Sequence, residues 1–220
     1  MRAHTIGIAM KQIREGKIVS ENLNVGYKSS SDFRDAFSKI MGTAPSHLAK
    51  YPTVLKASWI DSPLGPILAI ANNDALYLLE FVDRHGLEHE IEKVKQKMKA
   101  TIIPGNTPPI NSIEKELQEY FAGHLKKFNT PIKRIGSPFQ KMAWHALTSI
   151  PYGETRSYAE QAQAIGKPTA YRAIANANGA NQLAIIVPCH RIINSSGSLG
   201  GYGGGIARKQ WLIEHEKKNK

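Results

Sequence analysis

Three short apolar runs separated by two turn signals constrain the middle of this chain most strongly. The runs are Leu55–Ile60, Pro66–Ala71 and Ala75–Val82, and the turn signals are Ser62-Pro63-Leu64-Gly65 and Asn72-Asn73-Asp74. Apolar runs of this length, bounded by Gly, Pro, Asn and Asp, are typical of β-strands, and such short connections join antiparallel neighbours. The sequence therefore predicts a β-meander.

Two helical patterns follow the meander. They lie on either side of the extended stretch 101–104, and their apolar residues are Leu87, Ile91, Val94 and Met98 in the first and Ile113, Leu117 and Phe121 in the second. Helical spacing of apolar residues predicts helices that pack on the sheet. No catalytic constellation is visible here, so we interpret residues 53–133 as an α/β scaffold domain.

The last third of the chain, residues 134–220, carries mainly helical signals. Ser137-Pro138-Phe139-Gln140 combines a helix N-cap, a first-turn proline and a capping box, and predicts a helix to about Ile150. Two further helices are predicted over Ser157–Ile165 and Thr169–Asn178, joined by a turn that contains Gly166. This is helix-turn-helix spacing, for which generic helical packing is the alternative.

Residues 1–50 also have a helical pattern. A turn at residues 26–31 precedes an amphipathic series that includes Phe33 and Phe37 and ends at Gly42. This pattern resembles the second half of an AraC-type DNA-binding unit. We therefore expect a partial helix-turn-helix segment in front of the α/β domain, with a pair of packed helices that has no DNA role as the alternative.

The basic charge of the chain is concentrated at its two ends. The net charge is +11, yet residues 53–133 hold 10 Lys and Arg against 10 Asp and Glu. Residues 134–220 hold 11 basic residues against 4 acidic ones, and residues 1–52 hold 8 against 4. This distribution favours modules that bind a polyanion such as DNA. A basic surface that only maintains solubility is the alternative.

Composition also excludes several classes of protein. No apolar run reaches the roughly 18 residues of a membrane-spanning helix, and no signal-peptide pattern follows Met1. A single cysteine, Cys189, rules out an internal disulfide and argues against a metal site built from thiolates. We expect a soluble, cytoplasmic, nucleoid-associated protein with no membrane partner, no metal and no cofactor.

The single cysteine lies in the motif Pro188-Cys189-His190-Arg191, after the apolar run 184–187. That run is predicted to be a buried strand that Pro188 ends, which places Cys189 at the edge of the core. His190 supplies a base near neutral pH, and Arg191 adds positive charge. A lone cysteine is by default a small buried hydrophobe, so this dipeptide alone does not decide between packing and reactivity.

The order of motifs around Cys189 is more specific. The matching residues are Pro138-Phe139-Gln140, Ile150-Pro151-Tyr152-Gly153-Glu154-Thr155, Ser157-Tyr158, Gly166-Lys167-Pro168, Arg172-Ala173, Asn181, Pro188-Cys189-His190-Arg191, Gly200-Gly201-Tyr202, Trp211-Leu212 and Glu216. They closely resemble the O6-alkylguanine-DNA alkyltransferase family over residues 53–218. Together with the AraC-like segment, the chain resembles the C-terminal part of the bacterial adaptive-response proteins.

The resemblance implies a DNA repair reaction in which a damaged guanine is flipped out of the duplex. Its alkyl group passes irreversibly to Cys189, while His190 relays the thiol proton through water and Glu216 orients and charges that histidine. Asn181 is implied to tie the recognition helix to the active-site segment. Glu216 follows Leu212 and Ile213 by four and three residues, so it should face inward with them.

The resemblance also implies a DNA-binding set and a substrate pocket. Tyr158 would rotate the phosphate of the flipped nucleotide, and Arg172 would fill the vacated base stack from a minor-groove recognition helix. The remaining implied DNA contacts are Thr169, Ala173 and Arg191, and the implied pocket residues are Pro188, Ile192, Tyr202 and Gly203. Without the resemblance, we would interpret Tyr158 as an aromatic residue packed in the core and Arg172 as a charged residue exposed to solvent.

The expected function is therefore that of a methylated-DNA–protein-cysteine S-methyltransferase that acts once per chain. Its partner is double-stranded DNA that carries O6-alkylguanine, and by the same resemblance O4-alkylthymine, and the protein is expected to be a monomer. A cysteine hydrolase would also use Cys189 and His190, and a lesion-binding or transcription-regulatory DNA-binding protein is the other alternative. A single stoichiometric reaction would indicate the methyltransferase, whereas continued turnover would indicate the hydrolase.

Overall fold

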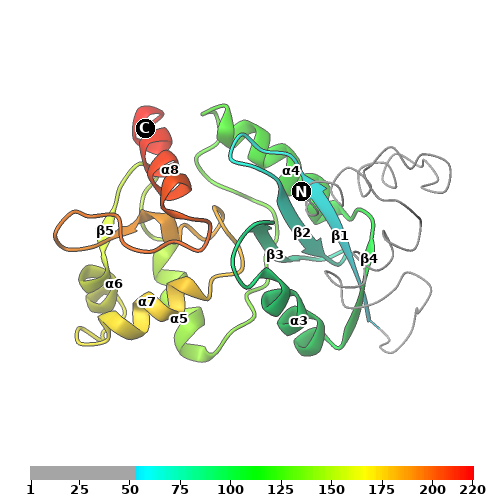
Figure 1. The fold of residues 1–220 in the computed structure, drawn as a ribbon, viewed down its shortest axis with the longest axis horizontal. Coiled ribbons are helices and arrows are strands. Elements are labelled where there is room, and N and C mark those ends of the chain that lie inside the picture. The colour runs from blue at the N-terminus through cyan, green and yellow to red at the C-terminus, as the bar shows by residue number, and fades with distance from the viewer. Residues whose placement is uncertain (1–52) are drawn as a thin grey trace. The chain divides into compact units, whose positions relative to one another are not determined.

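The computed structural model describes residues 53–220, and the predicted helix-turn-helix segment 1–50 lies outside them. Strands β1 (Thr53–Ile60), β2 (Ile67–Ala71) and β3 (Leu76–Phe81) form the predicted meander (Figure 1). Both strand pairs are antiparallel, with Ile60 opposite Ile67 and Ile67 opposite Phe81. Every residue of β2 and β3 is buried, so the alternation typical of a half-exposed strand is absent.

The two turns form as their residues predict. Gly65 has φ 103°, a conformation that suits glycine, and its N–H donates to the carbonyl of Ser62 at 3.0 Å. The side chain of Asn72 accepts hydrogen bonds from the N–H groups of Asp74 and Ala75, at 2.9 and 2.8 Å. An asparagine side chain that replaces backbone acceptors in this way stabilises a tight turn.

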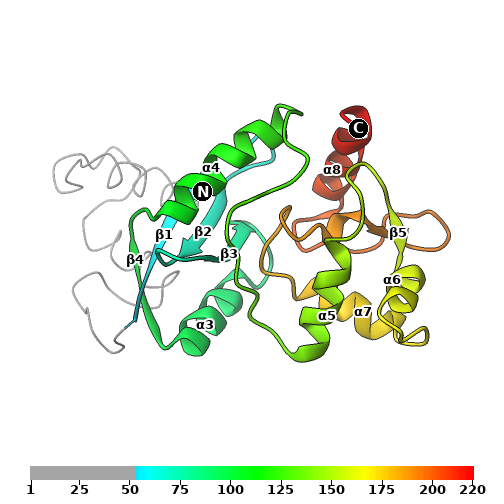
Figure 2. The same cartoon turned by 180° about the vertical axis from the view of Figure 1, so that it is seen from behind.

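A fourth strand, β4 (Ala100–Pro104), pairs in parallel with β1, so the sheet order is β3-β2-β1-β4. Helix α3 (Leu87–Met98) lies beside β3 and β4 in Figures 1 and 2. Helix α4 (Pro108–Phe121) follows β4. Both helices were predicted; the sequence indicated an extended segment at β4 but not its pairing, which depends on a partner about 47 residues away along the chain.

By its contacts the chain divides into two compact units. The first unit includes the sheet, continues along the chain as far as Lys115, and also contains the later segment Thr130–Lys133. The second unit consists of Glu116–Asn129 and Arg134–Lys220. The end of α4 therefore belongs with the second unit. This matters for the site, because α4 contributes Tyr120 to it.

The second unit is mainly helical. Its elements are α5 (Pro138–Leu147), β5 (Arg156–Ser157), α6 (Tyr158–Ala164), α7 (Tyr171–Gly179), the short 3₁₀ helix η1 (Cys189–Arg191), β6 (Ile192–Ile193) and α8 (Ile206–Lys218). The predicted capping box forms at Ser137, whose hydroxyl accepts from the N–H of Gln140 at 3.2 Å while the Gln140 side chain accepts from the N–H of Ser137 at 2.8 Å. Helix α5 ends at Leu147, three residues before the predicted end.

Helices α6 and α7 form the predicted helix-turn-helix, and Gly166 in the turn has φ 69°. Buried polar groups join this pair. Gln161 on α6 and Asn178 on α7 exchange two hydrogen bonds of 3.2 and 2.7 Å between their amides. The indole N–H of Trp144 on α5 donates to the carbonyl of Ala177 at 2.7 Å. Satisfied buried hydrogen bonds of this kind fix the position of α7 against its neighbours.

In the run 184–187, Ala184, Ile185 and Val187 are buried as predicted, but the run is a turn and not a strand. Ile185 has φ 70°, which is incompatible with an extended strand. The N–H of Val187 donates to the carbonyl of Leu183 at 2.9 Å, so the backbone satisfies itself locally. The strand prediction was wrong because a run that is buried on every side has no periodicity to distinguish strand from turn.

Among residues 53–220, no helix is long and apolar enough to cross a membrane.

Candidate functional site

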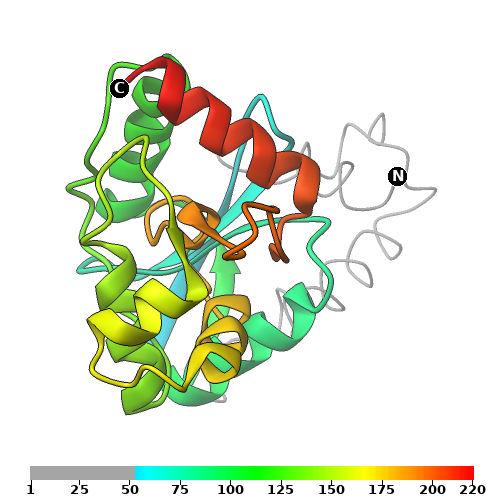
Figure 3. The ribbon, with the colours of Figure 1, turned by 90° about the vertical axis from the view of Figure 1, so that its left-hand side faces the viewer.

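Cys189 begins η1 directly after the buried Pro188. Its N–H donates to the carbonyl of Val187 at 2.8 Å, and its side chain is partly exposed. In Figures 1 and 3 the segment that contains η1 and the following loop lies between α8 on one side and α6 and α7 on the other. The thiol is therefore held by short-range backbone bonds at the centre of the second unit, and it retains access to solvent.

Asn181 fixes the segment that precedes Cys189. Its amide nitrogen lies 2.9 Å from the carbonyl oxygen of Val187 and 3.2 Å from Sγ of Cys189, and its amide oxygen accepts from the N–H of Leu183 at 3.1 Å. One buried side chain thus supports the turn on two sides and donates to the sulfur. A donor aimed at the sulfur favours the thiolate over the thiol.

Glu216 on α8 is the centre of a buried network. Its Oε1 accepts from Tyr120 at 2.8 Å and lies 2.8 Å from Nε2 of His190, and its Oε2 accepts from the N–H of Gly153 at 3.2 Å. Arg191 donates to both oxygens, from Nε at 2.8 Å and from Nη2 at 3.0 Å. The predicted inward orientation of Glu216 is confirmed, since its exposed fraction is 1%.

The charges of this network follow from its geometry. Burial by itself would raise the pKa of Glu216, but hydrogen bonds from His190 and Arg191, together with the positive charge of Arg191, outweigh it and hold that pKa below its ordinary value. Burial is also the largest effect on His190 and lowers its pKa below 6.5, against the opposing effect of Glu216. Arg191 already neutralises the carboxylate. The lowered pKa favours the neutral form of His190 at pH 7, whereas the resemblance implied that Glu216 keeps it charged.

The neutral form of His190 has a defined tautomer. An ionised carboxylate can only accept, so Nε2 carries the proton that is donated to Glu216, and Nδ1 carries a lone pair. Nδ1 is buried and has no hydrogen-bond partner among the described residues. Nδ1 of His190 is thus a proton acceptor next to Cys189 in the chain, and the bond from Nε2 to Glu216 fixes the orientation of the ring.

Arg191 does not have the predicted DNA-binding role in this geometry. Its exposed fraction is 8%, and besides Glu216 it donates to the carbonyl of Ile150 at 2.6 Å. The correction has a simple cause: in η1 the side chain turns inward to the carboxylate of Glu216, and a guanidinium matches a carboxylate with two parallel hydrogen bonds. Arg191 is a structural counter-ion.

The other predicted DNA contacts lie on the surface. Arg172, Thr169 and Ala173 are exposed at or just before the first turn of α7. The guanidinium of Arg172 lies 5.8 Å from the ring centre of Tyr171, which is 48% exposed. A cation and an aromatic ring thus stand together at the exposed start of the predicted recognition helix.

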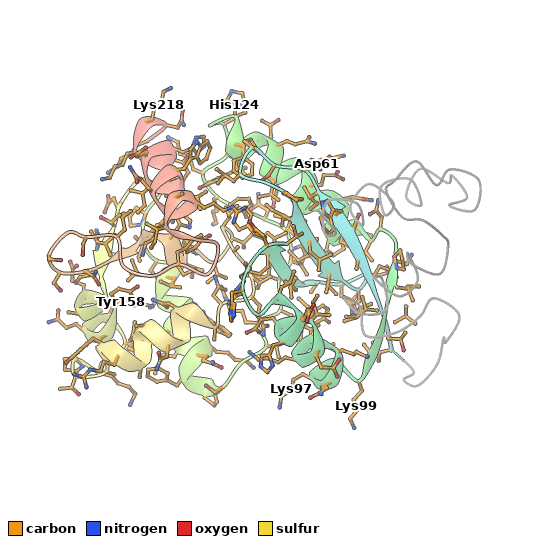
Figure 4. All side chains as sticks on the ribbon, in the orientation of Figure 1. Asp61, Lys97, Lys99, His124, Tyr158 and Lys218 are labelled. Atoms are coloured by element: carbon orange, nitrogen blue, oxygen red, sulfur yellow. The ribbon has the colours of Figure 1, made fainter. Side chains whose placement is uncertain are left out.

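Tyr158 is placed differently from these three. It begins α6 (Figure 4) and is half-buried, and its hydroxyl lies close to Gly200, where a β-carbon would approach it to 3.2 Å. Burial raises the pKa of Tyr158, and negative charge at Cys189 raises it further, so the phenol stays protonated. Its position favours a donor at the pocket beside the thiol.

The predicted pocket residues surround the same segment. Pro188 and Ile192 are buried on either side of η1, and β6, which contains Ile192, pairs in parallel with β5. The ring of Tyr202 meets that of His190 edge to face, with centres 6.4 Å apart. Gly203 is exposed in the glycine-rich loop. Pro188, Ile192 and Tyr202 thus lie beside the catalytic residues, and Gly203 follows Tyr202 in the exposed loop.

Sequence reasoning missed three contributors. Tyr120 and Gly153 hold Glu216, and Lys209 is buried on α8, where it donates to the carbonyl of Gly201 at 3.1 Å. Lys209 precedes Glu216 by seven residues, so helical spacing already placed both on one face. No local signal could have found Tyr120, which is 96 residues from Glu216.

Known proteins resemble both parts of the chain. Residues 138–218 match the model of the 6-O-methylguanine DNA methyltransferase, DNA binding domain, and residues 55–133 match that of the 6-O-methylguanine DNA methyltransferase, ribonuclease-like domain. The chain is 42% identical over 164 residues to a methylated-DNA–protein-cysteine methyltransferase of Methanosarcina barkeri, covering 73% of this chain and 96% of the relative. A relative of the same name from Mycobacterium tuberculosis H37Rv is 46% identical over 158 residues, 72% of this chain and 90% of the relative.

A solved structure is similar as well. The crystal structure of Mycobacterium tuberculosis OGT in complex with DNA superposes with a TM-score of 0.64 at 40% sequence identity, and the match covers 76% of this chain and 94% of that one.

Proposed function

The chain belongs to the 6-O-methylguanine DNA methyltransferase family, and on this premise we propose that it repairs DNA by transferring the alkyl group of O6-alkylguanine to its own Cys189. The observation that carries the proposal is the arrangement around one partly exposed thiol. Asn181 donates to its sulfur, and the neighbouring His190 is held by a buried carboxylate. The same reasoning extends to O4-alkylthymine, which presents an alkylated oxygen in a similar setting.

The reaction balances without a cofactor. The Cys189 thiolate attacks the alkyl carbon, a carbon–sulfur bond forms, and the bond from that carbon to O6 breaks with its electron pair left on the base. The guanine then takes up a proton. Regeneration would require the Cys189 thiolate to leave from the thioether, and a thiolate is a poor leaving group there, so the protein is consumed once per chain.

Each buried residue has a role in this scheme. His190 takes the thiol proton at Nδ1 through water, since Nε2 is committed to Glu216. Asn181 stabilises the developing thiolate and holds the turn before it. Glu216 orients His190 and is itself kept ionised by Arg191.

The exposed start of α7 is proposed to bind double-stranded DNA. Flipping a base costs a few kcal/mol of lost stacking and pairing, and a side chain that fills the gap recovers part of it. Arg172 is the group we assign to the gap, with Thr169 and Ala173 against the minor groove. Tyr158 acts from the pocket side on the flipped nucleotide, and Pro188, Ile192, Tyr202 and Gly203 line its pocket.

The domain assignment is part of the proposal. Residues 134–220 form the DNA-binding alkyltransferase domain, and residues 53–133 form the α/β scaffold. The helix-turn-helix segment predicted over residues 1–50 lies outside the described residues. We also propose that the protein acts in the cytoplasm at the nucleoid, where its substrate is.

The deciding experiment is intact-protein mass spectrometry after incubation with excess duplex DNA that contains O6-methylguanine. Each chain should gain one methyl group, mapped by peptide analysis to Cys189, and then stop reacting. The Cys189→Ser variant should gain none. Continued turnover of the DNA, steady hydrolysis of a simple ester, or a methyl group on another residue would contradict the proposal.

A further inference from the structure

Tyr120 is a completely buried tyrosine whose hydroxyl is aimed at the active-site carboxylate. It lies near the end of α4, and its exposed fraction is 0%. The hydroxyl donates to Oε1 of Glu216 at 2.8 Å. Burial and the charge of Glu216 raise the pKa of Tyr120 well above its ordinary value, so the phenol keeps its proton and acts as a donor. The proposed alkyl transfer gives this donor no role.

Helix α8 holds Tyr120 at two points. Nε2 of His215, the residue before Glu216, donates to the backbone carbonyl of Tyr120 at 2.7 Å. Four rings surround that of Tyr120 with centres 5.4 to 6.1 Å away, those of Phe121, Phe128, Tyr152 and His215. All of these residues belong to the second unit. Packing and a backbone hydrogen bond therefore fix the position of the hydroxyl at the carboxylate.

Tyr120 and His190 share one oxygen of Glu216. Oε1 lies 2.8 Å from the hydroxyl of Tyr120, 2.8 Å from Nε2 of His190 and 3.0 Å from Nη2 of Arg191. A carboxylate oxygen has about two lone-pair sites, so three donors compete for it. Each added donor stabilises the carboxylate and leaves less of its charge to stabilise a proton on His190. The bond from Tyr120 therefore opposes protonation of His190.

The other groups around His190 and Glu216 carry charge or lack this bond. Those that act on the pair are Arg191 of η1, Lys209 of α8, Tyr152 of the turn before β5 and Tyr202 of the loop before α8. The charges of Arg191 and Lys209 lower the pKa of His190, in addition to burial. Tyrosines are uncharged at neutral pH. The hydroxyl of Tyr120 can thus be removed without a change in the net charge of the site.

Tyr120 comes from outside the DNA-binding domain of the family. It lies within residues 55–133, which match the ribonuclease-like domain, whereas Cys189, His190 and Glu216 lie within residues 138–218. The domain that we interpreted from sequence as a scaffold thus supplies a side chain to the active-site network. A scaffold role alone does not account for a donor placed on the carboxylate that holds His190.

We propose that Tyr120 is a positioning residue for alkyl transfer, which holds Oε1 of Glu216 beside His190 and limits how strongly this carboxylate stabilises protonated His190, so that Nδ1 stays free to accept the thiol proton. Tyr120 keeps its own proton and does not touch the substrate. The proposal rests on the proposed function for its effect on alkyl transfer, whereas its effect on His190 needs no DNA.

The first test is the Tyr120→Phe variant, which keeps the ring and removes the hydroxyl. Loss of the competing donor should strengthen the bond from His190 to Oε1. The NMR resonance of the Nε2 proton should therefore move downfield, and the pKa of His190 should rise by about one unit. The chain has 8 histidines, so in protein labelled with ¹⁵N-histidine the signal of His190 is assigned by its absence from His190→Gln.

Tyr152→Phe is the matched control. The hydroxyl of Tyr152 is buried as well, but it has no hydrogen-bond partner among residues 53–220. Its removal should leave the Nε2 signal and the pKa of His190 at their wild-type values. An unchanged His190 in Tyr120→Phe overturns the proposal. So does an equal change in both variants, because the hydrogen bond would then not be its cause.

A second variant keeps the hydroxyl, and with it the fold, if Tyr120→Phe proves too unstable to study. Incorporation of 3-fluorotyrosine at position 120 makes the phenol more acidic and therefore a stronger donor. The Nε2 proton of His190 should now move upfield, and the pKa of His190 should fall. No change, or a change in the same direction as in Tyr120→Phe, contradicts the proposal.

The effect on alkyl transfer is measured as the single-turnover rate with duplex DNA that contains O6-methylguanine. In Tyr120→Phe the acid limb of the rate against pH should move up with the pKa of His190, which is about a tenfold loss below that pKa. A pH profile that stays in place while His190 shifts would overturn the role of Tyr120 in the reaction. If the wild-type chain transfers no alkyl group, the proposed function fails, and the NMR shift still decides whether Tyr120 acts on His190.

Discussion

Glu216 and Arg191 form a buried, two-point ion pair, with Nε to Oε2 at 2.8 Å and Nη2 to Oε1 at 3.0 Å. The pair lets the carboxylate remain ionised where it also meets His190. A buried ion pair contributes little relative to well-packed apolar groups, but removal of one partner leaves the other uncompensated. Loss of either Glu216 or Arg191 should therefore disrupt the site.

Glu216→Gln should destabilise the second unit and slow alkylation. Glutamine cannot accept from Nε and Nη2 of Arg191 at once, so the buried guanidinium loses its counter-ion at a cost of about 3 kcal/mol. Burial favours neutral His190, so the uncompensated positive charge of Arg191 should stabilise the Cys189 thiolate. The rate at which iodoacetamide alkylates Cys189 should therefore reach its pH midpoint at lower pH. Affinity for DNA should change little, since Glu216 is buried.

The measurements are urea unfolding, the alkylation rate and its pH profile, with the exposed Glu214→Gln as control. A midpoint that moves to higher pH would mean that the native His190 is charged. A Glu216→Gln variant with normal stability and a normal alkylation rate would show that Glu216 only packs α8 against its neighbours.

Arg172→Ala should impair repair of duplex DNA far more than reaction with a free alkylguanine. Only the duplex requires base flipping, which costs a few kcal/mol, so the loss on duplex should exceed about tenfold. Single-turnover rates on the two substrates give the comparison. Lys141→Ala, which removes the same charge from an exposed position on α5, is the control. Equal losses on both substrates would refute the assignment of Arg172 to the base stack.

Glu80→Gln should flatten the dependence of stability on pH in the first unit. Burial raises the pKa of Glu80 to about 8, although Arg84 at 2.6 Å opposes it. The folded state then binds more protons than the unfolded state between pH 4.5 and about 8. Stability should fall as pH rises through this window, by up to about 1.4 kcal/mol per unit.

Urea unfolding at several pH values measures this slope in the wild type and in the variant. The Glu88→Gln variant, which changes an exposed residue on α3 in the same unit, should leave the slope as it is. A slope of the opposite sign that disappears in Glu80→Gln would show that Arg84 keeps Glu80 ionised.

Gly153→Ala should destabilise the second unit more than Gly166→Ala. Both glycines have positive φ, 75° and 69°, so both substitutions carry a backbone cost of about 1–2 kcal/mol. At Gly153 the new β-carbon would also lie 2.9 Å from the backbone oxygen of Glu216, whereas nothing lies within 4 Å at Gly166. The difference in thermal stability between the two variants measures the effect of this contact. Equal losses of stability would show that α8 can move away from the new β-carbon without destabilising the unit.

Features that depend on neighbouring residues could be predicted from the sequence. The capping box at Ser137 joins residues three positions apart, and so do the hydrogen bonds of the turns at Gly65 and Asn72. Such bonds are decided by residue type at short range, where little chain entropy opposes them. The three strands, the helices and the motif around Cys189 followed from patterns of this kind together with the family resemblance.

Other features depended on contacts between residues that are far apart in the sequence. Arg191 turns inward because Glu216, 25 residues away, is the carboxylate within reach, and Tyr120 reaches that carboxylate across 96 residues. Burial is the largest effect on the pKa of His190, and burial is a property of the packed chain. The sequence by itself determined the local elements and the identity of the nucleophile, whereas only the tertiary structure decided the charges around it, because desolvation and counter-ions depend on segments brought together from far along the chain.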